Sequence, residues 1–294
     1  MDDKKKPVVR FGPSSNDVLF YEQGHKSSRE APAWLAKMGL TAYEISFGRG
    51  IRLSTKTAGE IGDEAKKHGV EISVHAPYYI NLANADPVRV QNAFGYIKRS
   101  LVALHALGGN RIVVHIGSQG DQTRENAILN CKVNLKTVIE LLDADEEIKE
   151  LGIKPLICIE VMGRHKWIGD VDEILEICKV DERVIPCLDF GHINAWMLGE
   201  LQKNPEMIIE IMTRVSKSLG AKKMQNIHIH FSHIIYGKSG EVKHTVLDDA
   251  KWSVPFEPLA KFLKDNNLGA TIICESQGTM AQDAVKLKGI FEGA

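Results

Sequence analysis

The chain has 294 residues, of which 44% are hydrophobic and 26% are charged. This composition excludes disordered and collagen-like classes and allows one large core. Lys and Arg number 37 against 38 Asp and Glu, so the net charge of -1 argues against histone-like binding of polyanions but permits a local basic surface. No apolar stretch approaches the roughly 20 residues that span a bilayer. The five cysteines form no CxxC pair, and no apolar segment follows the charged first residues, so we expect reduced thiols in a cytoplasmic protein without membrane contact.

Short apolar runs alternate with longer segments of helical spacing along the whole chain. The predicted strands are Val8–Gly12, Ala42–Ser46, Glu71–His75, Arg111–Ile116, Leu156–Val161, Ile185–Asp189, Asn226–Phe231 and Ala270–Glu275. The predicted helices are Glu30–Met38, Thr57–His68, Val88–Leu107, Arg124–Leu142, Val171–Cys178, Glu206–Leu219, Pro258–Asn266 and Met280–Phe291. Several strands are apolar on both faces, which is typical of a parallel sheet covered on both sides.

Eight strands alternating with eight helices predict an α/β fold, a single (β/α)8 TIM barrel with its active site at the C-terminal ends of the strands. No change of composition divides residues 1–294 into two domains, and residues 1–6 are expected to form a flexible tail. The alternative is an open doubly wound sheet. It is disfavoured because Gly48-Arg49-Gly50 lacks the third glycine of a dinucleotide-binding loop.

Polar side chains gather at the predicted strand ends. They are His75, His115, Glu160, Asp189, His192, His228, His230 and Glu275. A lone histidine in an apolar strand is more often a hydrogen-bonded core residue, but these ends converge on one face of a barrel. Three carboxylates there would repel one another without cations between them, and mixed nitrogen and oxygen donors suit Zn²⁺ or Mn²⁺. We therefore predict two or three ions with a bridging carboxylate.

The segments HAPYYINL, VVHIGS, CLDFGH, HIHFS and ICES, together with the strand that holds Glu160, resemble endonuclease IV, the apurinic/apyrimidinic (AP) endonucleases of the xylose-isomerase-like barrels. The resemblance runs from about Val8 to Glu275 and implies three zinc ions. His75, His115 and Glu160 would hold the first ion. Glu160 would bridge to a second ion, completed by Asp189, His228 and Glu275. His192 and His244 would bind the third.

Three positions depart from the family pattern. The usual third-metal pair is Asp-x-His, whereas here Val242 stands at the Asp position and Glu241 precedes it, so either Glu241 substitutes or the third site is weaker. The family's His-x-Asn-Asp-Ser segment is replaced by His228-Ile229-His230-Phe231-Ser232. We assign His228 as the ligand, with His230 as its rival. The segment VMGRHKW after Glu160 is unusually basic and aromatic.

The resemblance implies a hydrolase that nicks DNA 5′ to abasic sites in base excision repair, with Glu160, Asp189 and Glu275 as catalytic residues. Bound metal would acidify a water for in-line attack on the phosphodiester. Arg49 and Arg52 are candidate phosphate contacts, and Tyr78 and Tyr79 are candidate probes of the missing base in double-stranded DNA. We expect a monomer. The alternative is a single-metal sugar isomerase or epimerase of the same superfamily, and a barrel that binds metal without activity is a third reading.

Overall fold

The computed structural model describes residues 7–294, and the predicted tail over residues 1–6 lies outside the described residues. Eight parallel strands form one sheet in the order β1-β10-β7-β6-β5-β4-β3-β2. They are β1 (Val9–Pro13), β2 (Ala42–Ser46), β3 (Glu71–His75), β4 (Arg111–Val114), β5 (Leu156–Glu160), β6 (Val184–Asp189), β7 (Ile227–His230) and β10 (Ala270–Cys274). All eight predicted strands are present, with ends within two residues of the prediction.

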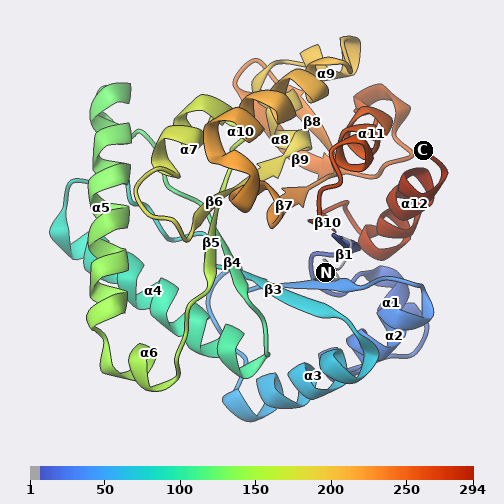
Figure 1. The fold of residues 1–294 in the computed structure, drawn as a ribbon, viewed down its shortest axis with the longest axis horizontal. Helices are drawn as coiled ribbons and strands as arrows, with labels where there is room; N and C mark the ends of the chain where they lie inside the picture. Colours follow the sequence, from blue (N-terminus) through green and yellow to red (C-terminus); the bar gives the residue numbers. More distant parts are fainter. Residues whose placement is uncertain (1–6) are drawn as a thin grey trace, which may run out of the picture.

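The sheet closes where β1 meets β2. The Thr41 amide donates to the Phe11 carbonyl at 3.1 Å, and the Ser15 amide donates to the Glu44 carbonyl at 2.8 Å. Gly12 makes this close approach possible, because a Cβ atom there would lie 1.7 Å from the Ala42 carbonyl oxygen. The strands therefore enclose a barrel, as the alternating pattern predicts (Figure 1).

Helices surround the barrel and cover its outer face (Figure 1). The predicted ones appear as α2 (Ala31–Lys37), α3 (Thr55–His68), α4 (Pro87–Ala106), α5 (Arg124–Ala144), α7 (Val171–Ile177), α10 (Met207–Met224), α11 (Glu257–Asp265) and α12 (Met280–Gly293). Side-chain caps begin several of them, including Ser54 before α3 and the Asp170–Glu173 capping box of α7. The prediction ended α10 at Leu219, next to Gly220, whose φ of 75° interrupts the helix before it continues to Met224.

Several short elements were not predicted. They are α1 (Val18–Glu22), η1 (Ser28–Glu30), α6 (Glu146–Glu150), α8 (Phe190–Trp196), α9 (Glu200–Lys203), the antiparallel hairpin of β8 (His233–Gly237) and β9 (Gly240–Thr245), and η2 (Ala250–Trp252). The hairpin and α8 follow β7 and β6, so they extend the face at the C-terminal ends of the strands.

The interior of the barrel has an apolar part and a polar part. Val113, Cys158, Ile185 and Cys187 form a small apolar cluster of their own, apart from the main core. Four polar side chains lie beside it, fully or almost fully buried: Glu44, Ser73, His228 and His230. Buried polar groups are costly unless they pair, so this polar layer points to a defined network beneath the strand ends.

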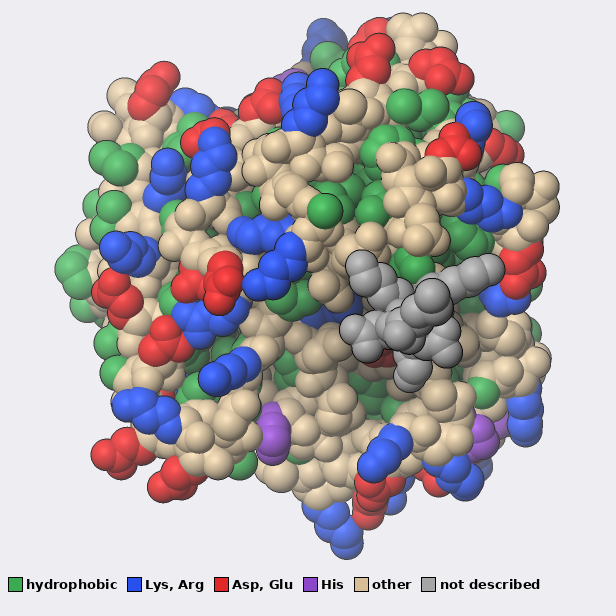
Figure 2. All heavy atoms as spheres, viewed as in Figure 1, with side chains coloured by type: hydrophobic (Ala, Val, Ile, Leu, Met, Phe, Trp, Pro, Cys, Tyr) green, Lys and Arg blue, Asp and Glu red, His purple; other side chains and the backbone are tan. Residues whose placement is uncertain are grey.

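The surface and the cysteines agree with the composition. Figure 2 shows Lys and Arg side chains interspersed with Asp and Glu over one face, as expected for a net charge of -1. All five cysteines are buried and unpaired. Across residues 7–294, no helix has the length and apolarity that crossing a membrane would require.

Candidate metal centre

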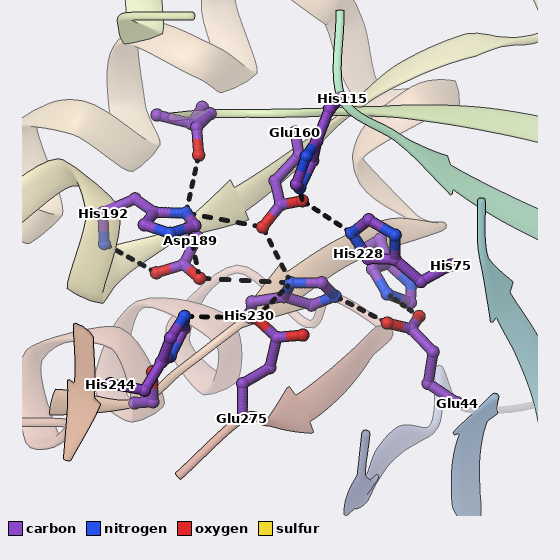
Figure 3. A network of polar contacts seen from close by, with 12 residues as sticks. Glu44, His75, His115, Glu160, Asp189, His192, His228, His230, His244 and Glu275 are labelled. Carbon is purple, nitrogen blue, oxygen red and sulfur yellow. Dashed lines mark hydrogen bonds and ion pairs between the residues drawn. The ribbon is translucent and has the colours of Figure 1, made fainter. Parts of the chain in front are cut away.

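Glu160, the last residue of β5, lies at the centre of the polar cluster (Figure 3). Its Oε2 atom is 2.9 Å from Nε2 of His75 and 2.8 Å from Nε2 of His115. His75 ends β3 and His115 directly follows β4, so three neighbouring strands supply this first set. The structure therefore brings together the three residues predicted for the first ion.

The other oxygen of Glu160 belongs to a second set. Its Oε1 atom is 3.2 Å from Nδ1 of His230, and the same nitrogen is 3.4 Å from Oε2 of Glu275 and 4.0 Å from Oδ2 of Asp189. One donor atom from each of Glu160, Asp189, His230 and Glu275 lies within 4.8 Å of all the others. Glu160 thus joins the two sets through its two oxygens, as a bridging carboxylate would.

His228 does not lie in the second set, which corrects our placement of this residue. The strand register pairs His230 with Asp189, whereas His228 pairs with Cys187, one layer deeper in the barrel. Residues two apart on a strand point to the same face but lie about 7 Å apart along it. Nε2 of His228 instead contacts Oε2 of Glu44 at 3.0 Å. The rival residue His230 occupies the position that we had assigned to His228.

A third set consists of His192, Glu241 and His244. Nε2 of His192 lies 3.5 Å from Oε2 of Glu241. In the β8–β9 hairpin, Ile235 pairs with Lys243 and Tyr236 pairs with Glu241, which leaves Val242 as a β-bulge. A bulge inserts one residue into the alternation, so Glu241 turns to the same face as His244. Val242 is 54% exposed, while the Glu241 side chain is 13% exposed. The bulge therefore places Glu241 with His192 and His244.

The donor groups are oriented as metal ligands would be. Nδ1 of His75 contacts the Ala76 carbonyl at 3.0 Å, and Nδ1 of His192 contacts the Val161 carbonyl at 3.0 Å. A hydrogen bond at Nδ1 leaves the Nε2 lone pair for a metal. Asp189 accepts the His192 amide through Oδ1 at 2.7 Å, and its buried Oδ2 has no hydrogen-bond partner. An orphaned carboxylate oxygen among imidazoles suits a bound cation.

Spacing supports the same conclusion. Ligands at about 2.0–2.2 Å from a zinc ion lie roughly 3–3.5 Å from one another. The nitrogen–oxygen contacts within the first and second sets fall between 2.8 and 4.0 Å. The residues of these two sets thus fit transition-metal ions that would share Glu160.

Without ions, protonated histidines balance the carboxylates. Burial lowers the pKa of His75, but the hydrogen bond to Glu160 and the negative charges of the nearby carboxylates together outweigh burial and raise that pKa to about 9. Burial also lowers the pKa of His192, yet the nearby Asp189 and Glu160 charges raise it to about 10. Burial raises the pKa of Asp189. Burial raises the pKa of Glu275, but the charge and hydrogen bond of His230, together with the charge of His244, outweigh burial and lower this pKa to about 2.

Arg49, Arg52, Tyr78 and Tyr79 lie on the loops that follow β2 and β3, outside the three sets. All four are exposed, and the two tyrosine rings contact each other with centroids 4.4 Å apart. The Tyr78 amide donates to the Gly48 carbonyl at 3.2 Å, which ties the two loops together. The arginines line a cavity of about 580 Å³, and the tyrosines line another of about 500 Å³.

Two more residues lie near the centre: Glu44, which was not predicted, and Trp167, which belongs to the basic and aromatic segment noted after Glu160. Glu44 is fully buried below His230, and Trp167 packs edge-on against His115 with ring centroids 5.8 Å apart. A signal for Glu44 was available, since it is a carboxylate in the otherwise apolar run AYEIS. Trp167 lies in the basic and aromatic segment that departs from the family pattern, but its sequence position does not indicate its contact with His115.

The chain is similar to known proteins. A family model described as a xylose isomerase-like TIM barrel matches residues 32–288. The chain is 31% identical to an uncharacterised protein of Methanocaldococcus jannaschii, over 86% of this chain and 88% of the relative. It is 30% identical to a probable endonuclease 4 of Mycoplasma pneumoniae, over 65% of this chain and 62% of that protein.

Solved structures show the same fold. Endonuclease IV from Thermus thermophilus superposes with a TM-score of 0.68 at 19% identity, covering 97% of this chain and all of that one. D-Psicose 3-epimerase from Clostridium cellulolyticum superposes with a TM-score of 0.60 at 16% identity, covering 92% and 87%. The resemblance to endonuclease IV that the motifs indicated is confirmed, and the chain belongs to the xylose isomerase-like TIM barrel family.

Proposed function

We propose that this protein is a metal-dependent AP endonuclease of the deoxyribonuclease IV type, which hydrolyses the phosphodiester 5′ to abasic sites in DNA base excision repair. The observation that carries the proposal is that Glu160 belongs to two adjacent sets of strand-end donors, with the set of His192, Glu241 and His244 as a further group of possible ligands. Similarity to proteins named probable endonuclease 4 supports it. Zn²⁺ is the ion that we propose, with Mn²⁺ as an alternative in some sites.

The chain's own residues would place the substrate phosphate. His115, Glu275 and His244 have side chains that are 19%, 18% and 26% exposed, whereas Glu160 and Asp189 are buried. The centre is therefore open along one side and closed beneath. We propose that Glu160, Asp189 and Glu275 are the catalytic carboxylates that would hold the ions. When bound, such ions lower the pKa of a water and neutralise charge on phosphate oxygens.

The flanking loops would hold the duplex. We propose that Arg49 and Arg52 contact phosphates and that Tyr78 and Tyr79 probe the position of the missing base. The exposed tyrosine pair and the link between its loop and that of Arg49 support this role. We further propose that the protein acts as a monomer in the cytoplasm, where five unpaired thiols would remain reduced.

A second candidate function is a sugar isomerase or epimerase. The set of Glu160, Asp189, His230 and Glu275 would hold a single ion, and the fold is also that of D-psicose 3-epimerase. A single-ion enzyme has no need of the first set beyond Glu160, or of the third. We therefore favour the nuclease.

The test combines metal counting with a nicking assay. Protein purified without chelator is analysed for ions per chain, and it is then incubated with an end-labelled duplex that contains one abasic analogue. We expect at least two ions per chain, three if Glu241 completes the third set, and a single cut 5′ to the lesion that chelation abolishes. Intact duplex is the control. One ion per chain, no cut, and interconversion of ketohexoses would overturn the nuclease in favour of the epimerase.

A further inference from the structure

We propose that Glu44 is a positioning residue for His230. Its carboxylate holds the Nε2–H group of this imidazole, which leaves Nδ1 as the atom that binds metal. The inference rests only on the metal-binding part of the proposed function. It concerns a residue that no strand-end pattern indicates, since Glu44 lies in the middle of β2.

Glu44 reaches His230 across the interior of the barrel. β2 and β7 are not neighbours in the sheet, yet Oε1 of Glu44 lies 3.1 Å from Nε2 of His230 (Figure 3). Both side chains are fully buried. Neither atom has a hydrogen-bond partner of ideal geometry among the described residues, so each has the other, in an ion pair at 3.1 Å, as its polar contact. This contact is therefore the link between the buried layer and the second set of donors.

The other carboxylate oxygen of Glu44 is already occupied. Its Oε2 atom accepts the Ser73 hydroxyl at 2.8 Å and contacts Nε2 of His228 at 3.0 Å. These two contacts hold the carboxylate in one orientation and direct Oε1 toward His230. They also give His228 a role, as a support for Glu44 in the buried layer.

His230 differs in this respect from the other histidines with an oriented ring. Neutral oxygens orient His75, His192 and His244: the carbonyls of Ala76 and Val161 and the hydroxyl of Ser232. Nδ1 of His192 also lies 3.3 Å from Oδ2 of Asp189, but Asp189 is itself a candidate metal ligand, whereas Glu44 belongs to none of the sets of donors and lies behind His230. A carboxylate that accepts the N–H of a ligating imidazole fixes its tautomer and increases the electron density at the other nitrogen, and losing such a partner typically lowers metal affinity about 10–100-fold.

Glu44→Gln tests the assignment, because the amide keeps the size of the side chain but removes its charge. Zinc affinities are measured by chelator competition. We expect one bound ion to lose about 10–100-fold in affinity while the others keep theirs. In long-range ¹H–¹⁵N spectra of zinc-loaded protein labelled at histidine, the parent's His230 should show a protonated Nε2 and a metal-shifted Nδ1, and the variant should lose this pattern. His230→Gln identifies the signals.

Glu71→Gln is the matched control, since it makes the same change from carboxylate to amide at a residue that pairs with Arg10 and Arg111 and not with a histidine of the centre. It should keep all ions within about threefold of the parent affinity, against the larger change expected from losing an orienting partner. If Glu44→Gln does not fold, as judged by circular dichroism, Glu44→Asp keeps the charge but retracts it, and an intermediate loss at the same ion is expected.

The outcomes separate this inference from the nuclease. Full zinc affinity and an unchanged His230 spectrum in a folded Glu44 variant would overturn the inference, even in a protein that nicks abasic DNA. Selective loss of one ion supports it, even in a protein that nicks no DNA. A parent that binds no zinc or manganese would overturn both.

Discussion

Glu160 and His230 face each other at the top of the barrel, with Oε1 of the carboxylate 3.2 Å from Nδ1 of the imidazole. The other carboxylate oxygen lies 2.9 Å from His75 on the far side. The Glu160 side chain therefore lies between two groups of donors that come from five other strands and loops. This arrangement makes Glu160 the residue whose loss should affect both groups at once.

We expect Glu160→Gln to lower the rate of abasic-site cleavage by at least about 100-fold, because both ions lose a shared anionic ligand. Single-turnover nicking with saturating enzyme measures this directly. Glu71→Gln is the matched control, since Glu71 starts β3 and pairs with Arg10 and Arg111 away from the centre. Near-parental cleavage by the Glu160 variant would remove the bridging role.

Gly163→Ala should remove the ion that we propose for the third set of residues. A Cβ atom at this position would lie 2.8 Å from Cβ of Glu241 and 2.9 Å from Cδ2 of His192, so both ligands must shift. Elemental analysis should show one ion fewer per chain than in the parent. Gly289→Ala serves as the control, because a Cβ atom there meets nothing within 4 Å. Equal metal content in the two variants would mean that His192 and Glu241 do not hold an ion together.

Replacing Tyr78 and Tyr79 together by Ala should weaken binding to abasic duplex more than to intact duplex, because the exposed ring pair would contact only the lesion. Metal content should not change.

Arg49→Ala should weaken binding to abasic and intact duplex about equally, and it should reduce the salt dependence of binding by about one unit of slope. Titrations at several salt concentrations measure these effects, with Arg214→Ala, a half-exposed arginine on α10, as the control. Parental discrimination in the double variant would exclude lesion probing.

Metal binding should release protons and strengthen as the pH rises. In ion-free protein His75 and His192 hold protons at neutral pH, because their pKa values are about 9 and about 10 against an ordinary 6.5. A metal must displace these protons, so zinc affinity should increase from about pH 7 to about pH 9. Calorimetry in buffers of different ionisation enthalpy would count the protons. A pH-independent affinity would contradict the assignment of these imidazoles as ligands.

Metal affinity should rise with pH, whereas the same raised pKa values predict that the stability of the ion-free protein falls with pH. A histidine whose pKa is raised on folding contributes stability below its unfolded value of about 6.5, and this contribution is lost as the pH rises through the folded value. The free energy of unfolding should therefore fall between about pH 6.5 and pH 9. Urea titrations measure it, and His75→Gln should flatten the decrease.

Local sequence patterns were sufficient to predict the strands and part of the candidate metal centre. His75 and Glu160 end predicted strands, and His115 follows one directly, so the rule that parallel strand ends converge brought them together. The order of the strands around the barrel follows from their alternation with helices. Asp189 also ends a predicted strand, and His192 follows it closely in the motif CLDFGH.

The sequence did not show which of two neighbouring residues reaches the centre. His228 and His230 share a face of β7, and only the pairing of His230 with Asp189 and of His228 with Cys187 shows which one reaches the centre. Glu241 reaches it because Val242 bulges out of a hairpin whose register depends on its partner strand.

The sequence by itself therefore determined the barrel, its functional end and the kinds of donor atom collected there, because periodicity and residue chemistry are local properties. The tertiary structure decided which histidine of β7 joins Glu160, that Glu241 joins His192, and that Glu44 supports His230 from a strand that is not its neighbour. These outcomes depend on strand register and on contacts across the barrel, between residues up to 186 positions apart, which no local pattern encodes.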